Sequence, residues 1–102
     1  MMKIRVVNNK MNYDKLRKQY ADNYVEEFGI KCEYCDKNEI SEVHEIFYGI
    51  LRKKSIENNY MACLCRSCHN KMHKDKSIFN IALFNKKYKN KDYHETKKEL
   101  LK

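Results

Sequence analysis

Three thiols and two imidazoles are packed into the eleven-residue stretch Cys63-Leu64-Cys65-Arg66-Ser67-Cys68-His69-Asn70-Lys71-Met72-His73. A second pair of thiols lies about thirty residues upstream, in Cys32-Glu33-Tyr34-Cys35. Two Cys-x-x-Cys pairs at this separation can close one tetrahedral zinc site of four thiolates. One such pair alone is a weak signal, whereas two pairs in a short chain indicate a structural metal site.

The histidines of the same stretch predict a second, separate metal site. His69 and His73 are four residues apart, so on a helix they project from one face, one turn apart. Two imidazoles placed in this way can bind one metal ion, or one ion together with the phosphate of a substrate. A third ligand has to come from elsewhere in the chain, and we expect it to be His44.

The length and the charge of the chain bound its class. With 102 residues it is expected to fold as one domain, residues 1–102, whose hydrophobic core alone is marginal. A bound metal is the usual remedy, because zinc binding contributes directly to the free energy of folding. The net charge of +8 favours a polyanionic partner, although frequent Lys and Asn also reflect an AT-rich genome. Charge alone does not decide between these two explanations.

The cysteine count and the apolar patterning indicate a reducing compartment. Five is an odd number of cysteines, which argues against a fully paired disulfide framework. The sequence has no apolar run that resembles a secretory signal and no stretch long enough to span a bilayer. Thiolates on zinc in the cytoplasm therefore fit better than disulfides in a secreted protein, and no membrane partner is expected.

A helix is predicted from about residue 13 to residue 28. Asn12 or Asp14 can cap its start, and Gly29 suits the position just after its end. Its apolar positions fall on one stripe, which we expect to cover one side of the zinc core. The members of this stripe are Leu16, Tyr20, Tyr24, Val25 and Phe28. Before this helix, residues 3–7 predict either a short strand or a loose terminus.

The middle of the chain predicts the order strand, loop, strand, helix. The strands are expected at residues 41–47 and 60–64, the loop at 48–59 and the helix at Arg66–Lys74. Within the loop, a turn of helix is expected from Ser55. Asn59 is predicted to adopt a left-handed conformation at its end, since asparagine tolerates positive φ better than most residues.

Two further helices are predicted in the C-terminal tail, at about residues 77–101. Ser77 suits the N-cap position of the first, which should run from residue 78 to about residue 88. Asp92-Tyr93-His94-Glu95 resembles a capping box for the second, which should end near Leu101. The lysines around them are expected to be either solvated or in contact with phosphate.

The succession Cys-x-x-Cys, His-x-Ile, Cys-x-x-Cys-His-x-x-x-His resembles the HNH family of ββα-metal endonucleases. The resemblance covers about residues 32–73 and implies a small α+β fold with a finger of two strands and a helix at 32–74. Such a finger binds a metal, enters the minor groove of DNA and cuts a phosphodiester bond. By motif position, the ligands of a structural Zn²⁺ that braces the finger would be Cys32, Cys35, Cys65 and Cys68. Cys63 falls outside both pairs and is predicted to be a small buried hydrophobe.

The resemblance also implies a catalytic metal site on His44, His69 and His73, which would take Mg²⁺, Mn²⁺, Ni²⁺ or Zn²⁺. The residue after the first ligand is usually the histidine that activates water, and here it is Glu45. A glutamate is ionised near pH 7 and can accept a proton, but it is a weaker base than imidazole. A nuclease with an altered base and a weakened or inactive module that binds DNA or a protein partner both remain open. A third interpretation, a small phage-type inhibitor of another protein, rests on chain size alone.

The remaining roles follow from positions in the same motif. The family's middle asparagine ties the loop between the strands, and Asn58 or Asn59 would take that part, although both lie slightly early relative to Cys65. Double-stranded DNA is the expected partner, with low sequence specificity because few side chains are placed to read base edges. The expected location is the cytoplasm of a bacterium or of a phage-infected host. The residues expected to hold flanking phosphates are Arg52, Lys53, Lys54, Arg66 and Lys71.

Overall fold

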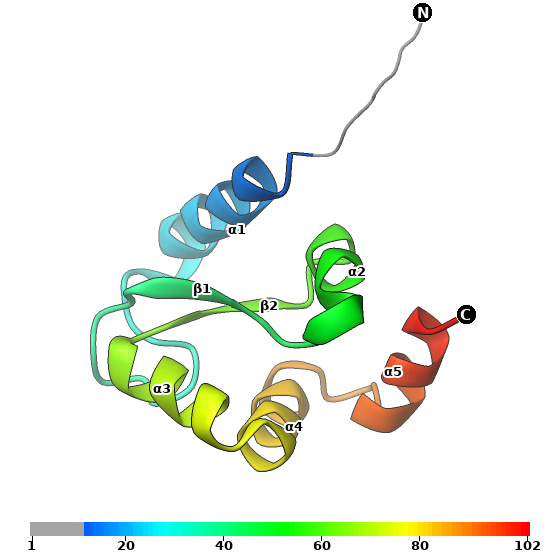
Figure 1. Cartoon of the computed structure of the whole chain (residues 1–102). Helices are drawn as coiled ribbons and strands as arrows, with labels where there is room; N and C mark the ends of the chain where they lie inside the picture. Colours follow the sequence, from blue (N-terminus) through cyan, green and yellow to red (C-terminus); the bar gives the residue numbers. More distant parts are fainter. Residues whose placement is uncertain (1–11) are drawn as a thin grey trace, which may run out of the picture.

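A short antiparallel hairpin with helices on both sides is the central feature of the computed structural model, which describes residues 12–102 (Figure 1). The elements are α1 (Tyr13–Phe28), β1 (Glu42–Glu45), the 3₁₀ turn η1 (Gly49–Leu51), α2 (Arg52–Glu57), β2 (Met61–Leu64), α3 (Arg66–Lys74), α4 (Lys76–Lys87) and α5 (Tyr93–Leu100). This is the small α+β fold that the sequence predicts. The strand expected at residues 3–7 lies outside the described residues.

The hairpin is the frame to which the helices attach. β1 and β2 pair antiparallel along their whole length. Both strands are shorter than predicted, and β1 ends before Phe47 because the backbone N–H of Phe47 donates to Ser55 Oγ at 3.1 Å. Successive side chains of a strand point to opposite faces, so His44 and Glu45 leave β1 in opposite directions.

The connection between the strands is more helical than predicted. The expected polar loop at 48–59 contains η1 and α2, and α2 begins at Arg52 rather than at Ser55. Most of α2 consists of Arg, Lys and Glu, which are good helix formers. Asn59 has a φ of 62°, which confirms the predicted left-handed position at the end of the connection.

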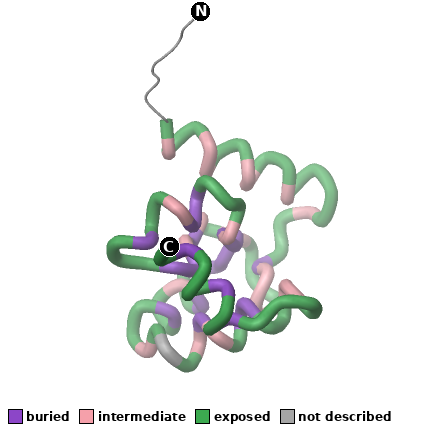
Figure 2. The backbone as a smooth tube through the Cα atoms, turned by 90° about the vertical axis from the view of Figure 1, so that its right-hand side faces the viewer, coloured by how far each residue is buried: buried purple, intermediate pink, exposed green. Residues whose placement is uncertain are grey.

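α1 has the predicted bounds, but its apolar stripe is only partly used. Asn12 is the N-cap, and its Oδ1 accepts a hydrogen bond from the backbone N–H of Lys15 at 3.1 Å. None of the residues of α1, all of which the structure describes, is fully buried, and Phe28 is 64% exposed. The prediction that Val25 and Phe28 pack on the core is therefore wrong. Figure 2 shows α1 at the periphery, outside the buried centre.

The reason is the direction in which α1 runs. Its contacts are with α2, β1 and β2, and Figure 1 shows it crossing the face of the hairpin opposite α3. The helix therefore covers one face of the hairpin, and its last turn carries the exposed Phe28. Phe28 packs there on Tyr24 of the same helix, with ring centroids 5.2 Å apart.

The C-terminal helices form as predicted, with one shift of boundary. α4 begins at Lys76, because Asp75 Oδ1 accepts a hydrogen bond from the backbone N–H of Ile78 at 3.2 Å and caps the helix. The prediction of Ser77 as the N-cap is wrong, and Ser77 lies inside the helix. Asp92 caps α5 as expected, accepting from the backbone N–H of Glu95 at 3.0 Å.

An aromatic cluster connects these two helices to the end of the hairpin. The ring of Phe47 stacks on Tyr93 of α5 with centroids 5.0 Å apart, and it meets Phe84 of α4 edge-on at 5.6 Å. Phe47 and Phe84 are almost completely buried. These rings belong to one buried core that also contains Cys32, Cys65 and Cys68, so apolar packing holds α4 and α5 on the finger beside the cysteine cluster.

Cys63 is buried in β2, as predicted, at 1% exposure. Burial raises the pKa of its thiol to about 12, so it stays protonated and behaves as an apolar side chain. Beside it, the carboxylate of Glu33 accepts from the backbone N–H of Cys63 at 2.6 Å and pairs with Lys87 Nζ at 2.6 Å. This ion pair ties α4 to the hairpin.

Candidate metal centres

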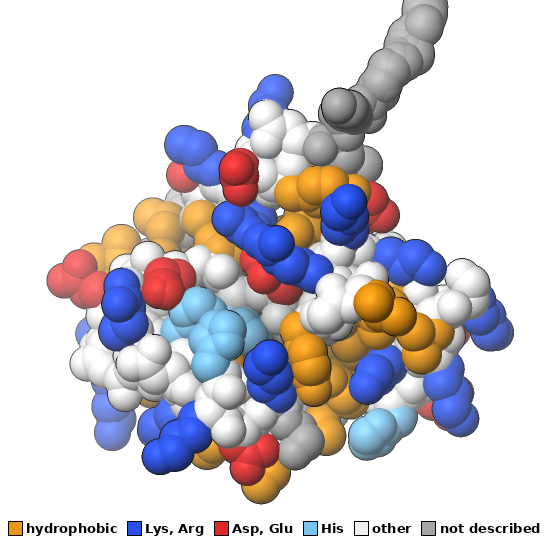
Figure 3. Space-filling view, in the orientation of Figure 1, with side chains coloured by type: hydrophobic (Ala, Val, Ile, Leu, Met, Phe, Trp, Pro, Cys, Tyr) orange, Lys and Arg blue, Asp and Glu red, His pale blue; other side chains and the backbone are white. Residues whose placement is uncertain are grey.

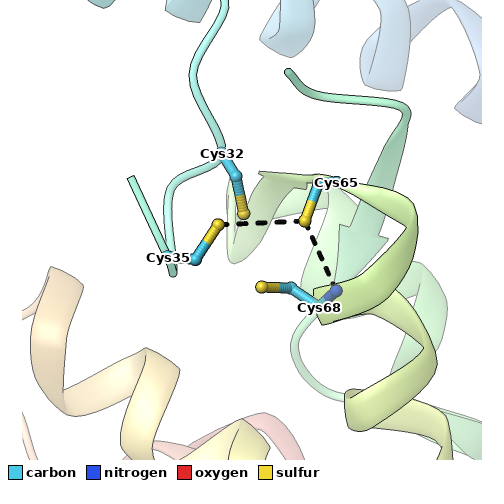
Figure 4. A group of neighbouring side chains, drawn as sticks. All are labelled: Cys32, Cys35, Cys65 and Cys68. Atoms are coloured by element: carbon cyan, nitrogen blue, oxygen red, sulfur yellow. Dashed lines mark hydrogen bonds between the residues drawn. The ribbon is translucent and has the colours of Figure 1, made fainter. Parts of the chain in front are cut away.

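The four cysteines of the two Cys-x-x-Cys pairs come together in one cluster. Their Sγ atoms lie within 4.8 Å of one another, and Figure 4 shows them pointing inward from two segments of chain. Four Zn–S bonds of about 2.3 Å in a tetrahedron place the sulfurs about 3.8 Å apart. The distance between Cys35 Sγ and Cys65 Sγ is 3.9 Å, so the donor set fits a structural zinc ion.

Each segment is shaped by backbone donors that point at sulfur. In the first, Asp36 adopts a φ of 63°, and the backbone N–H of Tyr34 donates to Cys32 Sγ at 3.4 Å. In the second, Cys65 is the N-cap of α3, and its Sγ accepts from the backbone N–H of Cys68 at 3.4 Å. Both Cys-x-x-Cys pairs thus form tight turns through hydrogen bonds that involve no metal.

At Cys35 and Cys65 these donors favour the thiolate, which is the form that binds zinc, whereas burial raises the pKa of the Cys68 thiol. Backbone N–H groups, that of Asn38 foremost, lower the pKa of Cys35 to about 6. Burial alone raises the pKa of Cys65, but hydrogen bonds from Cys68 and from the Asn38 amide outweigh it and lower that pKa. Sequence reasoning missed Asn38, whose only signal is its place three residues after Cys35.

The three histidines also come together, on β1 and α3. One ligand nitrogen from each of His44, His69 and His73 lies within 4.8 Å of the others. The Nε2 atoms of His69 and His73 are 3.0 Å apart, which confirms that the i, i+4 spacing brings the two rings together. Figure 3 shows histidine side chains grouped on this face of the molecule, with acidic and basic side chains around them.

A carboxylate orients the central ring of this group. His69 Nδ1 lies 2.7 Å from Glu42 Oε1, so Nε2 of the same ring is the nitrogen turned to His73. The hydrogen bond from His69 lowers the pKa of Glu42. Carboxylate–histidine pairs of this kind fix ring orientation at metal sites. Sequence reasoning missed Glu42, although residues two apart on a strand share a face, and Glu42 lies two before His44.

His44 is the most buried member, at 6% exposure. Burial lowers the pKa of its imidazole to about 4, against the hydrogen bond with Asn80, which raises that pKa. The neighbouring rings of His69 and His73 lower the pKa and Glu45 raises it, each with a smaller effect. The ring is therefore neutral near pH 7, as a metal ligand must be. Its Nε2 lies 2.6 Å from Oδ1 of Asn80, a buried residue of α4 that sequence reasoning also missed.

A groove of about 650 Å³ runs along β1 and is open to solvent. β1 and the histidines form one part of its wall, and α1 and the start of α2 form the other. Glu45 also lines this groove, but from the far face of β1. Its Oε2 pairs with Arg17 Nη1 at 3.2 Å, and its Oε1 pairs with Arg52 Nε at 3.1 Å. The sequence does not predict the pairing of Arg17 with Glu45.

Of the basic residues expected to bind phosphates, some lie at the groove and others make contacts elsewhere. Arg52 lines the groove, and Arg66 Nε lies 3.4 Å from Glu42 Oε2 at its edge. Lys54 instead donates to the backbone carbonyl of Leu100 at 2.6 Å, and Lys53 lies over the ring of Tyr13. The groove is also lined by residues outside the family motif, among them Arg17, Lys18, Tyr48 and Lys76.

Lys71 and the two asparagines expected to brace the loop lie away from the groove lining. Lys71 is exposed on α3. Asn58 Nδ2 donates to the backbone carbonyl of Lys54 at 2.8 Å, across the last turn of α2. Asn59 takes the left-handed position described above, and its carbonyl accepts from the hydroxyl of Tyr88 at 3.2 Å. Both asparagines therefore make contacts at the end of the connection between the strands.

Comparison with protein-family models, with curated proteins and with solved structures gave no match for this chain. Within residues 12–102, no helix combines the length and the apolar character needed to cross a bilayer. Function is therefore inferred from the two clusters and the groove.

Proposed function

We propose that this chain is a metal-dependent endonuclease of the HNH type, which hydrolyses phosphodiester bonds in double-stranded DNA with low sequence specificity. The observation that carries the proposal is the grouping of His44, His69 and His73. One ring nitrogen of each lies within 4.8 Å of the others, although the residues come from β1 and α3. They line a groove that also contains arginine, lysine and glutamate. A hairpin, a helix and a four-cysteine cluster in this order support the same assignment.

The donor chemistry of the histidines suits a divalent ion. His44 is neutral near pH 7, and Glu42 holds His69 with Nε2 turned toward His73, so imidazole lone pairs are offered in a group. Bound there, the ion would stabilise the negative charge that grows on the phosphate and on the leaving oxygen. The cysteine cluster would brace α3 and take no part in the reaction.

Arg17 and Arg52 are the groups that would bind the phosphates beside the cut. Both guanidiniums line the groove, and guanidinium matches a phosphate as well as it matches a carboxylate. A phosphodiester entering the groove competes with Glu45 for them. Glu45 is then released from its salt bridges at the moment that substrate arrives.

The released carboxylate of Glu45 acts as the general base. It takes a proton from a water molecule, and the water oxygen forms a bond to phosphorus. The bond between phosphorus and the 3′ oxygen breaks, and that oxygen takes a proton from solvent. In this scheme the histidines, through the ion they would hold, position the phosphate relative to the carboxylate of Glu45.

The same salt bridges favour a second candidate, a module that binds DNA and cleaves nothing. If Arg17 and Arg52 keep hold of Glu45 in the complex, no base is free to activate water. The basic residues of the groove would still bind a polyanion. The two candidates share the fold and differ only in what Glu45 does when DNA is bound.

Nicking of supercoiled plasmid separates them. The zinc-loaded protein is incubated with plasmid and Mg²⁺, Mn²⁺ or Ni²⁺, beside His69→Ala and a matched control, His94→Ala, which changes a histidine of α5 outside the groove. If the protein is a nuclease, the wild type and His94→Ala should nick the plasmid in a metal-dependent way, and His69→Ala should not. Tight DNA binding without nicking under any metal would establish the binding module instead.

A further inference from the structure

Asn80 makes an unusual contact with the histidine group. Its side chain is completely buried on α4, yet it reaches His44 on β1, with Oδ1 2.6 Å from Nε2. Among the side chains that the structure describes, Asn80 Nδ2 has no hydrogen-bond partner. Buried amides are ordinarily satisfied at both ends. A buried asparagine that uses only its oxygen, and uses it on one imidazole, requires an explanation.

The tautomers of a neutral imidazole explain why Asn80 contacts His44 through its oxygen. Such a ring carries one proton, on Nδ1 or on Nε2, and only the other nitrogen has a lone pair for a metal. A carbonyl oxygen at 2.6 Å from Nε2 requires that Nε2 carry the proton, because two lone pairs facing each other at that distance repel. The lone pair of His44 is then on Nδ1.

We propose that Asn80 is a positioning residue, which holds His44 as the Nε2–H tautomer so that Nδ1 is the nitrogen offered to the divalent ion. The proposal rests on the proposed function only in taking the histidines as a metal site. It gives Asn80 the part for His44 that Glu42 has for His69. The two outer partners come from different elements, α4 and β1, so the ligand set depends on how α4 packs against the finger.

This arrangement gives α4 a role beyond the hydrophobic core. Leu83 and Phe84, also fully buried on α4, fix the helix against the finger close to Asn80. The amide therefore has little freedom to move away from the ring. An exposed partner would lose the contact by side-chain rotation, whereas this one keeps the tautomer fixed even without a metal.

The test reads the tautomer directly. Protein with ¹⁵N-labelled histidine and zinc in the cysteine cluster alone is examined by long-range ¹H–¹⁵N NMR, and a second equivalent of Zn²⁺ is then added. We expect His44 to carry its proton on Nε2 in both states, and the added Zn²⁺ to move the Nδ1 resonance. A proton on Nδ1 before addition, or Zn²⁺ coordination through Nε2, overturns the proposal.

Three variants extend the test to affinity. Asn80→Leu removes the acceptor, and we expect Zn²⁺ affinity at the histidines to fall about 10–100-fold. Asn80→Asp keeps an acceptor for the Nε2 proton and should retain most of the affinity. Asn85→Leu, at an exposed position of the same helix, is the matched control and should bind as the wild type does. Equal affinity of Asn80→Leu and Asn85→Leu overturns the proposal.

No nucleic acid and no cleavage enters these measurements, so a failed nuclease assay leaves them valid. If the histidines bind no Zn²⁺ at all, the proposed function fails. In that case the metal-free spectrum still decides whether Asn80 fixes the tautomer of His44.

Discussion

The cysteine cluster and the histidine cluster are built from neighbouring residues but differ in exposure and in the groups around them. The sulfur atoms face inward, three of the four cysteines are buried, and backbone N–H groups surround them. The exposure of the histidines increases from buried His44 to exposed His73, and all three line a groove whose walls carry charged side chains. Structural zinc sites are closed and catalytic sites keep an open position. The contrast therefore predicts that losing the first cluster destroys the fold, whereas losing the second destroys only function.

The largest effect should follow from breaking the closed cluster. In Cys68→Ser we expect loss of the zinc and of the folded state, because structural zinc contributes about 10–16 kcal/mol to the folding of small domains. Zinc content and circular dichroism during heating measure both losses. The matched control is Cys63→Ala, which removes a thiol outside the cluster and should cost only about 1 kcal/mol. If both variants melt alike, the cysteine cluster does not carry the fold.

The next effect concerns the open groove. Replacing Glu45 by glutamine should lower the rate of plasmid nicking about 10²–10⁴-fold, since a general base typically contributes that much. The same variant should bind DNA more tightly, because Arg17 and Arg52 lose their carboxylate partner. Rates and binding are measured separately, by nicking and by fluorescence anisotropy.

Glu45→His sharpens this result. A gain in rate over the wild type would mean that the groove is a nuclease site with a weakened base. Nicking by Glu45→Gln at the wild-type rate would reject Glu45 as the base.

A smaller effect should appear in the pH dependence of stability without metal at the histidines. Burial lowers the pKa of His44 to about 4 from 6.5, so between these values the unfolded chain binds more protons than the folded one. Stability should therefore fall as pH decreases through this window, by at most about 3 kcal/mol from His44.

Urea unfolding of protein with zinc in the cysteine cluster alone, at pH 7 and at pH 5.5, measures this dependence. The control is His44→Gln, which lacks the titrating ring and should show a weaker dependence on pH. Parallel losses in the two proteins would mean that His44 does not contribute, and that the cysteine cluster alone responds to acid.

The smallest effect tests whether the two clusters are independent. In Glu42→Gln, His69 loses its carboxylate, and Ni²⁺ affinity at the histidines should fall about 10–100-fold while zinc content stays unchanged. Titration calorimetry and metal analysis measure the two quantities. Glu26→Gln, at an exposed position of α1, is the control. A fall in zinc content would show that the clusters are coupled through β1.

The sequence predicts which side chains of α3 lie together because their spacing is local. Cys65, Cys68, His69 and His73 all lie on or beside one helix, where separations of three and four residues determine which side chains share a face. The strand order and the left-handed Asn59 also follow from local signals. These are features that a few neighbouring residues decide.

The residues that orient the ligands could not be predicted in the same way. His69 and Glu42, His44 and Asn80, and Glu45 and Arg17 are pairs separated by 27, 36 and 28 residues. The first pair forms only once α3 has packed against β1, and the other two only once α4 and α1 have packed against the finger. The exposure of Phe28 has the same origin, because the direction of α1 over the hairpin determines how much of its stripe finds a partner.

Cys65 belongs to the cysteine cluster and is also the N-cap residue of α3. Its sulfur is part of the cysteine cluster and also caps the helix that carries His69 and His73. Filling the sulfur cluster thus fixes the first turn of that helix, and with it the spacing of both rings. If both clusters bind metal as proposed, we expect zinc to bind without the second cation, whereas the second cation should bind best after zinc. Removal of zinc should then also weaken binding of a divalent ion at the histidines.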